Sequence, residues 1–388
     1  MTEAYIIDAA RTAVGRRNGA LAGAHPADLA AHVLSAVVAR QPIDPAAIDD
    51  VVLGCIDQIG SQAGDLARTA VLAAGLPESV PGVTIDRQCG SGQQAVHFAA
   101  QAVMSGTSDI VLAGGVQNMS QYPIMSGFAA GAAYGPTDPW TGSEGWKRRY
   151  GDEEMSQFRG AELIAQHWGI TRPDNEAFAL ESHRRAVAAI EQGLFVDEIV
   201  PFRGHSIDEG PRADTSLEKM SQLATLSEGG TLTAATSSQI ADGAAVLMVA
   251  SAAAVERFGL TPRARIHHIS VTGADPVMML SAPIPATQRA LQRAGLSIDD
   301  IDVVEINEAF APVVLAWLKE IGADPSRVNP NGGAISLGHP IGCTGARLMT
   351  SMVHELERTG GRFGLQTMCE GGGQANVTII ERMDSGDR

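Results

Sequence analysis

The 388 residues of the chain are 45% hydrophobic and 19% charged, which indicates a folded globular protein of two or three domains. Disorder is excluded as the main state, because apolar runs alternate with charged residues along the whole chain. Lys and Arg total 28 against 44 Asp and Glu. The resulting net charge of −16 argues against nucleic acid or an anionic membrane surface as a partner.

Only four cysteines occur, at positions 55, 89, 343 and 369, and none of them forms a CxxC pair. Zinc sites need closer spacing and disulfide scaffolds need a higher density, so we expect reduced thiols and no metal site. The start of the chain lacks the basic residues of a signal peptide, and no stretch reaches the ~20 apolar residues of a membrane span. We therefore expect a cytoplasmic protein.

Short β-branched runs alternate with longer alanine-rich segments at helical period, which predicts an α/β fold. In the first half, the pattern predicts strands at residues 4–7, 50–53, 83–86 and 109–113, and helices at 27–39 and 93–105. The strand at 109–113 is expected to end at Gly114. In the second half, it predicts helices at 287–294 and 345–356, and strands at 302–306, 363–368 and 376–380.

The two halves repeat the same order of elements. Asp50-Val51-Val52 corresponds to Asp302-Val303-Val304, and this offset of 252 residues places the loop around Cys89 opposite the loop at 338–342. Residues 119–242 differ, with more aromatic and charged residues and with helices predicted at 161–167 and 175–192. The sequence therefore predicts a duplicated α/β unit, residues 1–118 plus 243–267 and residues 268–388, with an insertion at 119–242.

Cys89 follows a predicted strand and stands directly before Gly90, Gly92 and a predicted helix. A thiol at a helix N-terminus feels the positive end of the helix dipole, so we expect the pKa of Cys89 to fall from ~8.5 toward the thiolate range. The glycines let backbone N–H groups approach a bound oxyanion. A buried cysteine in a turn is the ordinary alternative, but this context favours a nucleophile.

Three further loops carry side chains that suit acid–base chemistry. His339 precedes Pro340, which keeps it outside helical geometry and makes it a candidate base, although a lone histidine is more often a surface or core residue. Cys369 precedes three glycines, which suit a ligand-binding loop or a simple hairpin equally well. Asn307 ends a predicted strand, where its ordinary role is to cap the next helix.

Taken together, these loops resemble the motif set of the thiolase family. The resemblance rests on Cys89-Gly-Ser-Gly, Asn307-Glu-Ala-Phe-Ala, Gly338-His-Pro-Ile-Gly and Cys369 with its glycines. It extends over nearly the whole chain, from Asp8-Ala-Ala-Arg11-Thr12 through Val116-Gln-Asn-Met-Ser120 to Val377-Thr-Ile-Ile. It implies the thiolase fold, in which two duplicated halves form αβαβα layers and carry an inserted loop domain.

The resemblance also implies a role for each motif residue. Cys89 would be the acyl-accepting nucleophile, His339 the residue that activates it, and Cys369 the acid–base group that moves the α-proton of acetyl-CoA. Asn307 would hold a water that forms, with His339, an oxyanion hole for the thioester oxygen. The N–H groups of Cys89 and Gly371 would form a second hole for the acyl-enzyme. Preorganised donors are needed because a thiolate alone is too weak a base for this proton.

The implied reaction is the CoA-dependent cleavage of a 3-oxoacyl-CoA to acetyl-CoA and a shortened acyl-CoA, in fatty-acid or steroid degradation. Coenzyme A is then a co-substrate, and no tightly bound cofactor is expected. Within the insertion, the resemblance assigns Arg212 to the nucleotide end of CoA and Ser238 to its pantetheine arm. A solvated surface charge and a turn residue are the ordinary alternatives for these two. The family also implies a homodimer or homotetramer.

The sequence departs from the family pattern around the substrate. Short-chain members carry a histidine near Met155, whereas Glu154-Met-Ser-Gln stands here. Glu370 occupies a position that is usually apolar, and Gln239 and Ala241 replace Gly and Asn beside Ser238. These departures argue against strict acetoacetyl-CoA specificity. They favour a resemblance to actinobacterial degradative thiolases, some of which act on steroid-derived acyl groups.

Three other functions remain as alternatives. A biosynthetic thiolase would form acetoacetyl-CoA with the same residues. A decarboxylating ketosynthase would need a second histidine in place of the Asn307 loop and would not need Cys369. A non-catalytic acyl-CoA-binding protein would not need Cys89 and His339. Cys55 and Cys343 are expected to be packing residues.

Overall fold

The computed structural model describes residues 3–383 and contains one mixed β-sheet of ten strands. The strands are β1 (Ala4–Arg11), β2 (Gly15–Arg16), β3 (Asp50–Gly54), β4 (Val83–Ile85), β5 (Ile110–Asn118), β6 (Ala241–Ser251), β7 (Ala264–Gly273), β8 (Val303–Ile306), β9 (Phe363–Glu370) and β10 (Gln374–Arg382). Their order across the sheet is β4-β3-β5-β6-β1-β7-β10-β9-β8, and β2 pairs with β6. Within this described range, no helix is long and apolar enough to cross a membrane.

The two halves of the sheet have corresponding pairings, except that β4 is matched by no strand of the described second half. In the first half, β3 is parallel to β4 and β5, and β6 is antiparallel to β5 and β1. In the second, β8 is parallel to β9, and β10 is antiparallel to β9 and β7. The halves join where Tyr5 and Ile6 of β1 pair with Arg265 and Ala264 of β7.

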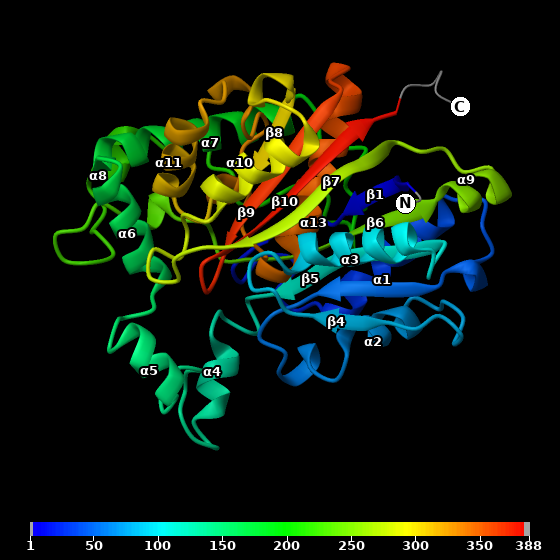
Figure 1. Cartoon of the computed structure of the whole chain (residues 1–388), viewed down its shortest axis with the longest axis horizontal. Coiled ribbons are helices and arrows are strands. Elements are labelled where there is room, and N and C mark those ends of the chain that lie inside the picture. The colour runs from blue at the N-terminus through cyan, green and yellow to red at the C-terminus, as the bar shows by residue number, and fades with distance from the viewer. Residues whose placement is uncertain (1–2, 384–388) are drawn as a thin grey trace.

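Helices cover the sheet in layers (Figure 1). The helices of the two halves are α1 (Pro26–Ala39), α2 (Leu66–Ala73), α3 (Ser91–Ser105), α9 (Ala252–Phe258), α10 (Pro283–Ala294), α11 (Ala311–Ile321), α12 (Ala334–Leu337) and α13 (Ile341–Thr359). The buried apolar side chains of α1 and α2 form one core with the first half, and those of α10 and α11 form another with the second. Apolar residues of α3 and α13 form a third core with strands of both halves. This α–β–α–β–α order confirms the predicted fold class.

One hydrogen-bond motif occurs at the same place in both halves. The Asp49 carboxylate accepts hydrogen bonds from the N–H groups of Asp109 and Ile110. The Asp302 carboxylate accepts them from the N–H groups of Arg362 and Phe363. The two sets lie 253 residues apart, one residue more than the offset read from the sequence. The parallel pairings agree with this offset, because Asp50 faces Val111 and Val303 faces Gly364.

Two parts of the sheet differ from the sequence expectation. Strand β5 continues through Gly114 and Gly115 to Asn118. Position 115 needs a glycine, because a side chain there would lie 2.0 Å from the carbonyl oxygen of Gly342. The short strand β2 and the strands β6 and β7 were not predicted. Strand β6 is buried along its whole length, so it lacks the alternation of apolar and polar residues that marks a half-buried strand.

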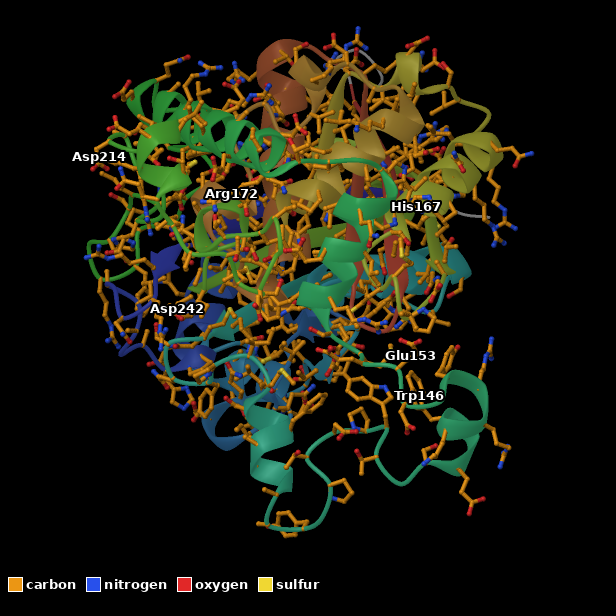
Figure 2. All side chains as sticks on the ribbon, turned by 90° about the vertical axis from the view of Figure 1, so that its left-hand side faces the viewer. Trp146, Glu153, His167, Arg172, Asp214 and Asp242 are labelled. Atoms are coloured by element: carbon orange, nitrogen blue, oxygen red, sulfur yellow. The ribbon has the colours of Figure 1, made fainter. Side chains whose placement is uncertain are left out.

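Residues 119–242 combine short helices with long connecting segments. They contain α4 (Ser126–Gly131), α5 (Glu144–Tyr150), α6 (Gln157–His167), α7 (Arg172–Glu191) and α8 (Leu217–Ser221). Helices α4 and α5 project from the body of the molecule, and Trp146 and Glu153 lie on this projection (Figures 1 and 2). A chain of ring contacts through Phe128, Trp140, Trp146 and Tyr150 holds the projection together.

Candidate active site

Cys89 lies in a tight loop between β4 and α3. Gln88 has a positive φ of 50°, and Gly90 is the N-cap residue of α3. The Ser91 hydroxyl closes the loop, because it accepts a hydrogen bond from the Arg87 N–H at 2.9 Å and donates one to the Gln88 carbonyl at 2.6 Å. The predicted position of Cys89 before a helix is therefore present in the structure.

The environment of the Cys89 sulfur is apolar. The half-buried side chain packs against a cluster of Ile56, Met119 and Ile341. This burial, and next the Glu370 carboxyl, raise the pKa of Cys89 to about 12, while the N–H groups of Gly371 and of Cys89 itself lower it. The sequence expectation of a lowered pKa is wrong, because desolvation outweighs the effect of the helix N-terminus. Cys89 is a thiol here and needs a base.

His339 has the features of such a base. Its backbone N–H donates to the Gln239 carbonyl at 2.9 Å, and its ring atom Nδ1 lies 2.6 Å from the Thr344 hydroxyl. That hydroxyl donates its own hydrogen to the Pro340 carbonyl at 3.0 Å, so it can only accept from Nδ1. Nδ1 therefore carries the proton, and Nε2 is a lone pair without a partner in residues 3–383. Burial, and then the Arg347 charge, lower the pKa of His339 to about 3, so the ring is neutral.

Close contact between α3 and α13 brings the Cys89 and His339 loops together. A side chain at Gly92 would lie 2.9 Å from the Gly342 carbonyl oxygen, and one at Gly345 would lie 2.3 Å from the Gln93 nitrogen. The Gln117 amide oxygen accepts from the N–H groups of Ile56, at 3.0 Å, and Gly342, at 3.3 Å. The segments that flank both loops are thereby fixed to one another.

Cys369 lies near the end of β9, and Gly371 lies in the turn that follows, before β10. Cys369 is fully buried, and its pKa is raised well above the usual value by burial and by the neighbouring Cys89 sulfur. The Gly371 N–H interacts with the Cys89 sulfur. The structure thus brings Cys89, Cys369 and Gly371 together, with two thiols and one backbone donor at a single point.

Asn307 follows β8 and lies beside this turn. Its N–H donates to the Thr367 carbonyl at 3.1 Å, two residues before Cys369. The side chain is fully buried, and its amide oxygen and nitrogen have no partner among the described residues. Asn307 does not cap the next helix, since the N-cap residue of α11 is Phe310. A buried amide with both atoms free is suited to hold a water or a ligand group.

The predicted CoA residues lie on neighbouring segments. The Gln239 side chain donates to the carbonyl of Gly210 at 3.1 Å, and so joins the stretch of Ser238 to that of Arg212. The Gln239 carbonyl also accepts from the His339 N–H, which connects both stretches to the candidate base. Ser238 is half-buried, whereas Arg212 is exposed. Hydrogen bonds of Gln239 thus link the backbone at His339 to the segment that leads to the exposed Arg212.

The sequence did not predict the contacts of two residues near the site, Thr344 and Glu370. Thr344, which fixes the tautomer of His339, lies five residues after it in the first turn of α13, and that spacing was the available signal. Glu370 was expected near the acyl or pantetheine pocket, but its side chain is fully buried against Gly90. In residues 3–383, no group of three or more His, Cys, Asp or Glu side chains is arranged to hold a metal ion.

Comparison with known proteins agrees with this geometry. The thiolase N-terminal domain matches residues 4–253, and the thiolase C-terminal domain matches residues 260–382. The chain is 63% identical to steroid 3-ketoacyl-CoA thiolase FadA6 of Mycobacterium tuberculosis, over 99% of this chain and 95% of that protein. It is 45% identical to the β-ketoadipyl-CoA thiolase of Pseudomonas aeruginosa, over 98% and 99% of the two chains. The chain therefore belongs to the thiolase family and is a CoA-dependent acyltransferase.

Proposed function

We propose that the protein cleaves 3-oxoacyl-CoA esters with coenzyme A through an acyl intermediate on Cys89. The main support is the meeting of Cys89, Cys369 and the Gly371 N–H at one point, beside a neutral histidine with a free Nε2. A nucleophile, a separate acid–base group and an oxyanion donor are the three components that this chemistry needs.

In the first half-reaction, His339 Nε2 takes the thiol proton of Cys89, and the sulfur attacks the 3-oxo carbon. The bond between the α- and β-carbons breaks, and its electron pair forms the enolate of acetyl-CoA. A water held by Asn307, together with the His339 ring, stabilises the enolate oxygen. The Cys369 thiol then gives its proton to the α-carbon, and acetyl-CoA leaves.

The second half-reaction returns both sulfurs to their starting state. The Cys369 thiolate takes the proton of a free CoA thiol, and the CoA sulfur attacks the acyl group on Cys89. The N–H groups of Cys89 and Gly371 hold the oxyanion that develops. The shortened acyl-CoA leaves, and Cys89 regains its proton from His339. The reverse sequence is a Claisen condensation.

We assign CoA binding to the 119–242 insertion, with Ser238 at the pantetheine arm and Arg212 at the nucleotide end. The link from His339 through Gln239 to Gly210 supports this, since the thioester must reach the site while the nucleotide stays at the surface. The exposed Arg212 suits a phosphate, because it keeps its charge in water until the ligand binds.

For the acyl group we propose a bulky, ring-bearing chain such as a steroid fragment. Apolar side chains surround Cys89, and Met119 and Ile124 of that wall belong to the start of the insertion, which adapts more readily than a core strand. The steroid activity named for the 63% identical relative supports the same substrate class. A strict acetoacetyl-CoA thiolase is the alternative, which also covers the biosynthetic direction.

Thiolysis measured over a panel of acyl-CoA esters tests this proposal. We expect kcat/KM to be highest for ring-bearing 3-oxoacyl-CoA, lower for medium chains and lowest for acetoacetyl-CoA. A clear preference for acetoacetyl-CoA would contradict the substrate class. Cys89→Ser should abolish the acyl adduct that mass spectrometry detects under turnover. Cys369→Ala keeps Cys89 as the adduct site but should lose thiolysis of 3-oxoacyl-CoA. Full cleavage by Cys369→Ala would exclude its acid–base role.

We further propose a homodimer or homotetramer in a reducing, cytoplasmic compartment. Strand β4 is an edge of the sheet, and Val83 on it is 43% exposed, which suits pairing with a second copy. All four cysteines are free thiols. The division into 1–118 plus 243–267, 119–242 and 268–388 remains part of this proposal. Light scattering of the purified protein measures the assembly.

A further inference from the structure

Glu370 is a buried carboxyl group that the proposed reaction does not use. It is the last residue of β9, and since side chains alternate along a strand it points to the sheet face opposite Cys369. Its side chain is 0% exposed. Neither carboxyl oxygen has a hydrogen bond of normal geometry to any other atom of residues 3–383. A buried carboxyl without such partners is costly, so its presence beside the Cys89 loop needs an explanation.

The carboxyl lies directly against the loop of the proposed nucleophile. A Cβ atom placed on Gly90 would be 2.0 Å from Glu370 Oε1 and 2.6 Å from its carboxyl carbon. Gly90 follows Cys89 and caps the N-terminus of α3, so Glu370 occupies the space next to the first turn of that helix. Both Cys89 and Glu370 are therefore exposed to the same positive end of the helix dipole.

Few other charges act on this point. Arg87 is close enough to lower the pKa of Glu370, but its Nη1 donates to the Gln374 side chain at 2.8 Å instead of forming an ion pair. Asp86 acts weakly on Cys89 from the same loop.

On β10, the facing residues Gln374 and Asn376 carry no charge. On α3, burial lowers the pKa of His97 to about 3 and keeps that ring neutral. Cys369 is the remaining titratable neighbour.

We propose that Glu370 is a positioning residue that controls the nucleophile: as a neutral acid it permits a thiolate on Cys89, and as a carboxylate it suppresses one. The site then holds one negative charge at a time at the N-terminus of α3. The proposal rests on the assignment of Cys89 as the nucleophile. It needs no contact between Glu370 and substrate, because the effect acts through the charge next to Gly90.

The direction of the ionisation follows from burial. Burial raises the pKa of Glu370 to about 8, with the Arg87 charge and the Asn376 N–H acting in the opposite direction. Glu370 in turn is the second cause of the raised pKa of Cys89, after burial. Below about pH 7 Glu370 is neutral and does not oppose the thiolate, and above about pH 9 it is ionised and does.

Alkylation of Cys89 by iodoacetamide tests the proposal without any substrate. Its rate is measured by mass spectrometry of the Cys89 peptide over a range of pH, in the wild type and in Glu370→Gln. We expect the two rates to agree below about pH 7 and the variant to react roughly tenfold faster above about pH 9, as one pKa unit would give. Rates that coincide at every pH would overturn the proposal.

Two further variants separate this effect from folding. Glu305→Gln is the matched control, because burial also raises the pKa of Glu305 to about 8 but the charges that act on it are Arg347 and other carboxylates, not Cys89. Its alkylation profile should follow the wild type, and an equal shift would overturn the proposal. If Glu370→Gln does not fold, Glu370→Met removes the charge at similar volume and should show the same fast alkaline reaction. Absence of an acyl adduct during turnover would instead contradict the proposed function and leave the alkylation result unaffected.

Discussion

At the scale of single residues, the site holds several buried polar atoms without partners. Within residues 3–383, His339 Nε2 and both amide atoms of Asn307 are examples, and the Glu370 oxygens lack hydrogen bonds of normal geometry. Each such atom costs about 1–3 kcal/mol, and a protein that carries several of them in one place is less stable than a saturated core would be. The cost falls at the ends of β8 and β9 and in the loop before α13. In the proposed reaction the free atoms of His339 and Asn307 bind substrate or water, so stability and reactivity compete at these two residues.

The tautomer of His339 gives the first prediction. In Thr344→Val, Nδ1 loses the hydroxyl oxygen that accepts its proton, so the ring no longer presents a lone pair reliably at Nε2. We expect kcat to fall roughly 10- to 100-fold, in the range of a general base removed in part, with KM little changed. Steady-state kinetics and circular dichroism measure the loss and the retained fold.

Thr344→Ser is the control for this prediction. It keeps the hydroxyl and removes only a methyl group, so activity should return to near the wild-type value. If the serine variant were as slow as the valine variant, packing and not the tautomer would explain the loss. If neither variant were slow, the contact between His339 Nδ1 and the Thr344 hydroxyl would not control the tautomer.

At the scale of elements, the distance between the two reactive loops is set by glycines where α3 crosses α13. Gly92 and Gly345 let the two helices approach so closely that a side chain at either position would meet backbone atoms of the other helix. Cys89 precedes α3 and His339 precedes α13. The contact therefore determines how far the proposed nucleophile lies from its proposed base, and a wider spacing of the two helices would move both residues.

Gly345→Ala is predicted to affect stability and catalysis together. Its methyl group would lie 2.3 Å from the Gln93 nitrogen, and this backbone atom can only move if α3 shifts. Overpacking of this kind costs about 1–3 kcal/mol of unfolding free energy, and we expect kcat to fall roughly 100-fold as well, since small displacements of reacting groups are costly. Urea denaturation and thiolysis assays measure the two effects. Gly23→Ala, where nothing lies within 4 Å, should change neither.

Sequence reasoning found elements and motifs but not their contacts. The helix predicted at 93–105 is present as Ser91–Ser105, and the reactive loops lie where their motifs placed them. Strand β6 was missed because burial on both faces removes its periodicity. The raised pKa of Cys89 was missed because a motif shows the helix N-terminus but not the apolar side chains that arrive from distant segments. Three-dimensional burial reverses the sign that local structure suggests.

At the scale of the whole molecule, a buried ion cluster connects the insertion to the sheet. Arg11 of β1 bonds to the carboxylates of Glu198, at 2.6 Å, and Asp208, at 2.7 Å, and all three are almost fully buried. Asp208 also accepts from the Val14 N–H, and Glu198 from the Ser351 hydroxyl. The segment that leads to Arg212 is thus attached to the first strand of the molecule.

Arg11→Met should therefore act at a distance from the reactive cysteines. It leaves two buried carboxylates without their cation, which costs about 3–5 kcal/mol of unfolding free energy. We expect KM for CoA to rise as the Arg212 segment loosens, with the Cys89 alkylation rate unchanged. Arg184→Met is the control, because its partner Glu181 lies at the surface and such pairs contribute less than about 1 kcal/mol. Equal losses in both variants would show that the cluster carries no special stability.

Two carboxyls whose pKa values are raised to about 8 also predict how the stability of the molecule depends on pH. Glu370 and Glu305 have pKa values of about 8 in the folded protein, above the 4.5 of a free glutamate. Between these values the unfolded chain has released a proton that the folded chain keeps, so the free energy of unfolding falls as pH rises through this window. Each group contributes about 1.4 kcal/mol per pH unit.

Urea denaturation between about pH 5 and pH 8 measures this slope. Glu370→Gln and Glu305→Gln should each make the slope of the unfolding free energy against pH less steep by the contribution of one carboxyl. The double variant should remove both contributions, because the two residues lie in different strands and share no partner. The sign separates this prediction from a salt-bridge loss, since removal of a paired carboxylate would lower stability at neutral pH, whereas these variants should raise it by a few kcal/mol. A variant that is less stable than the wild type at about pH 8 would mean that its carboxylate has a partner in solution, and for Glu370 that partner would be Arg87.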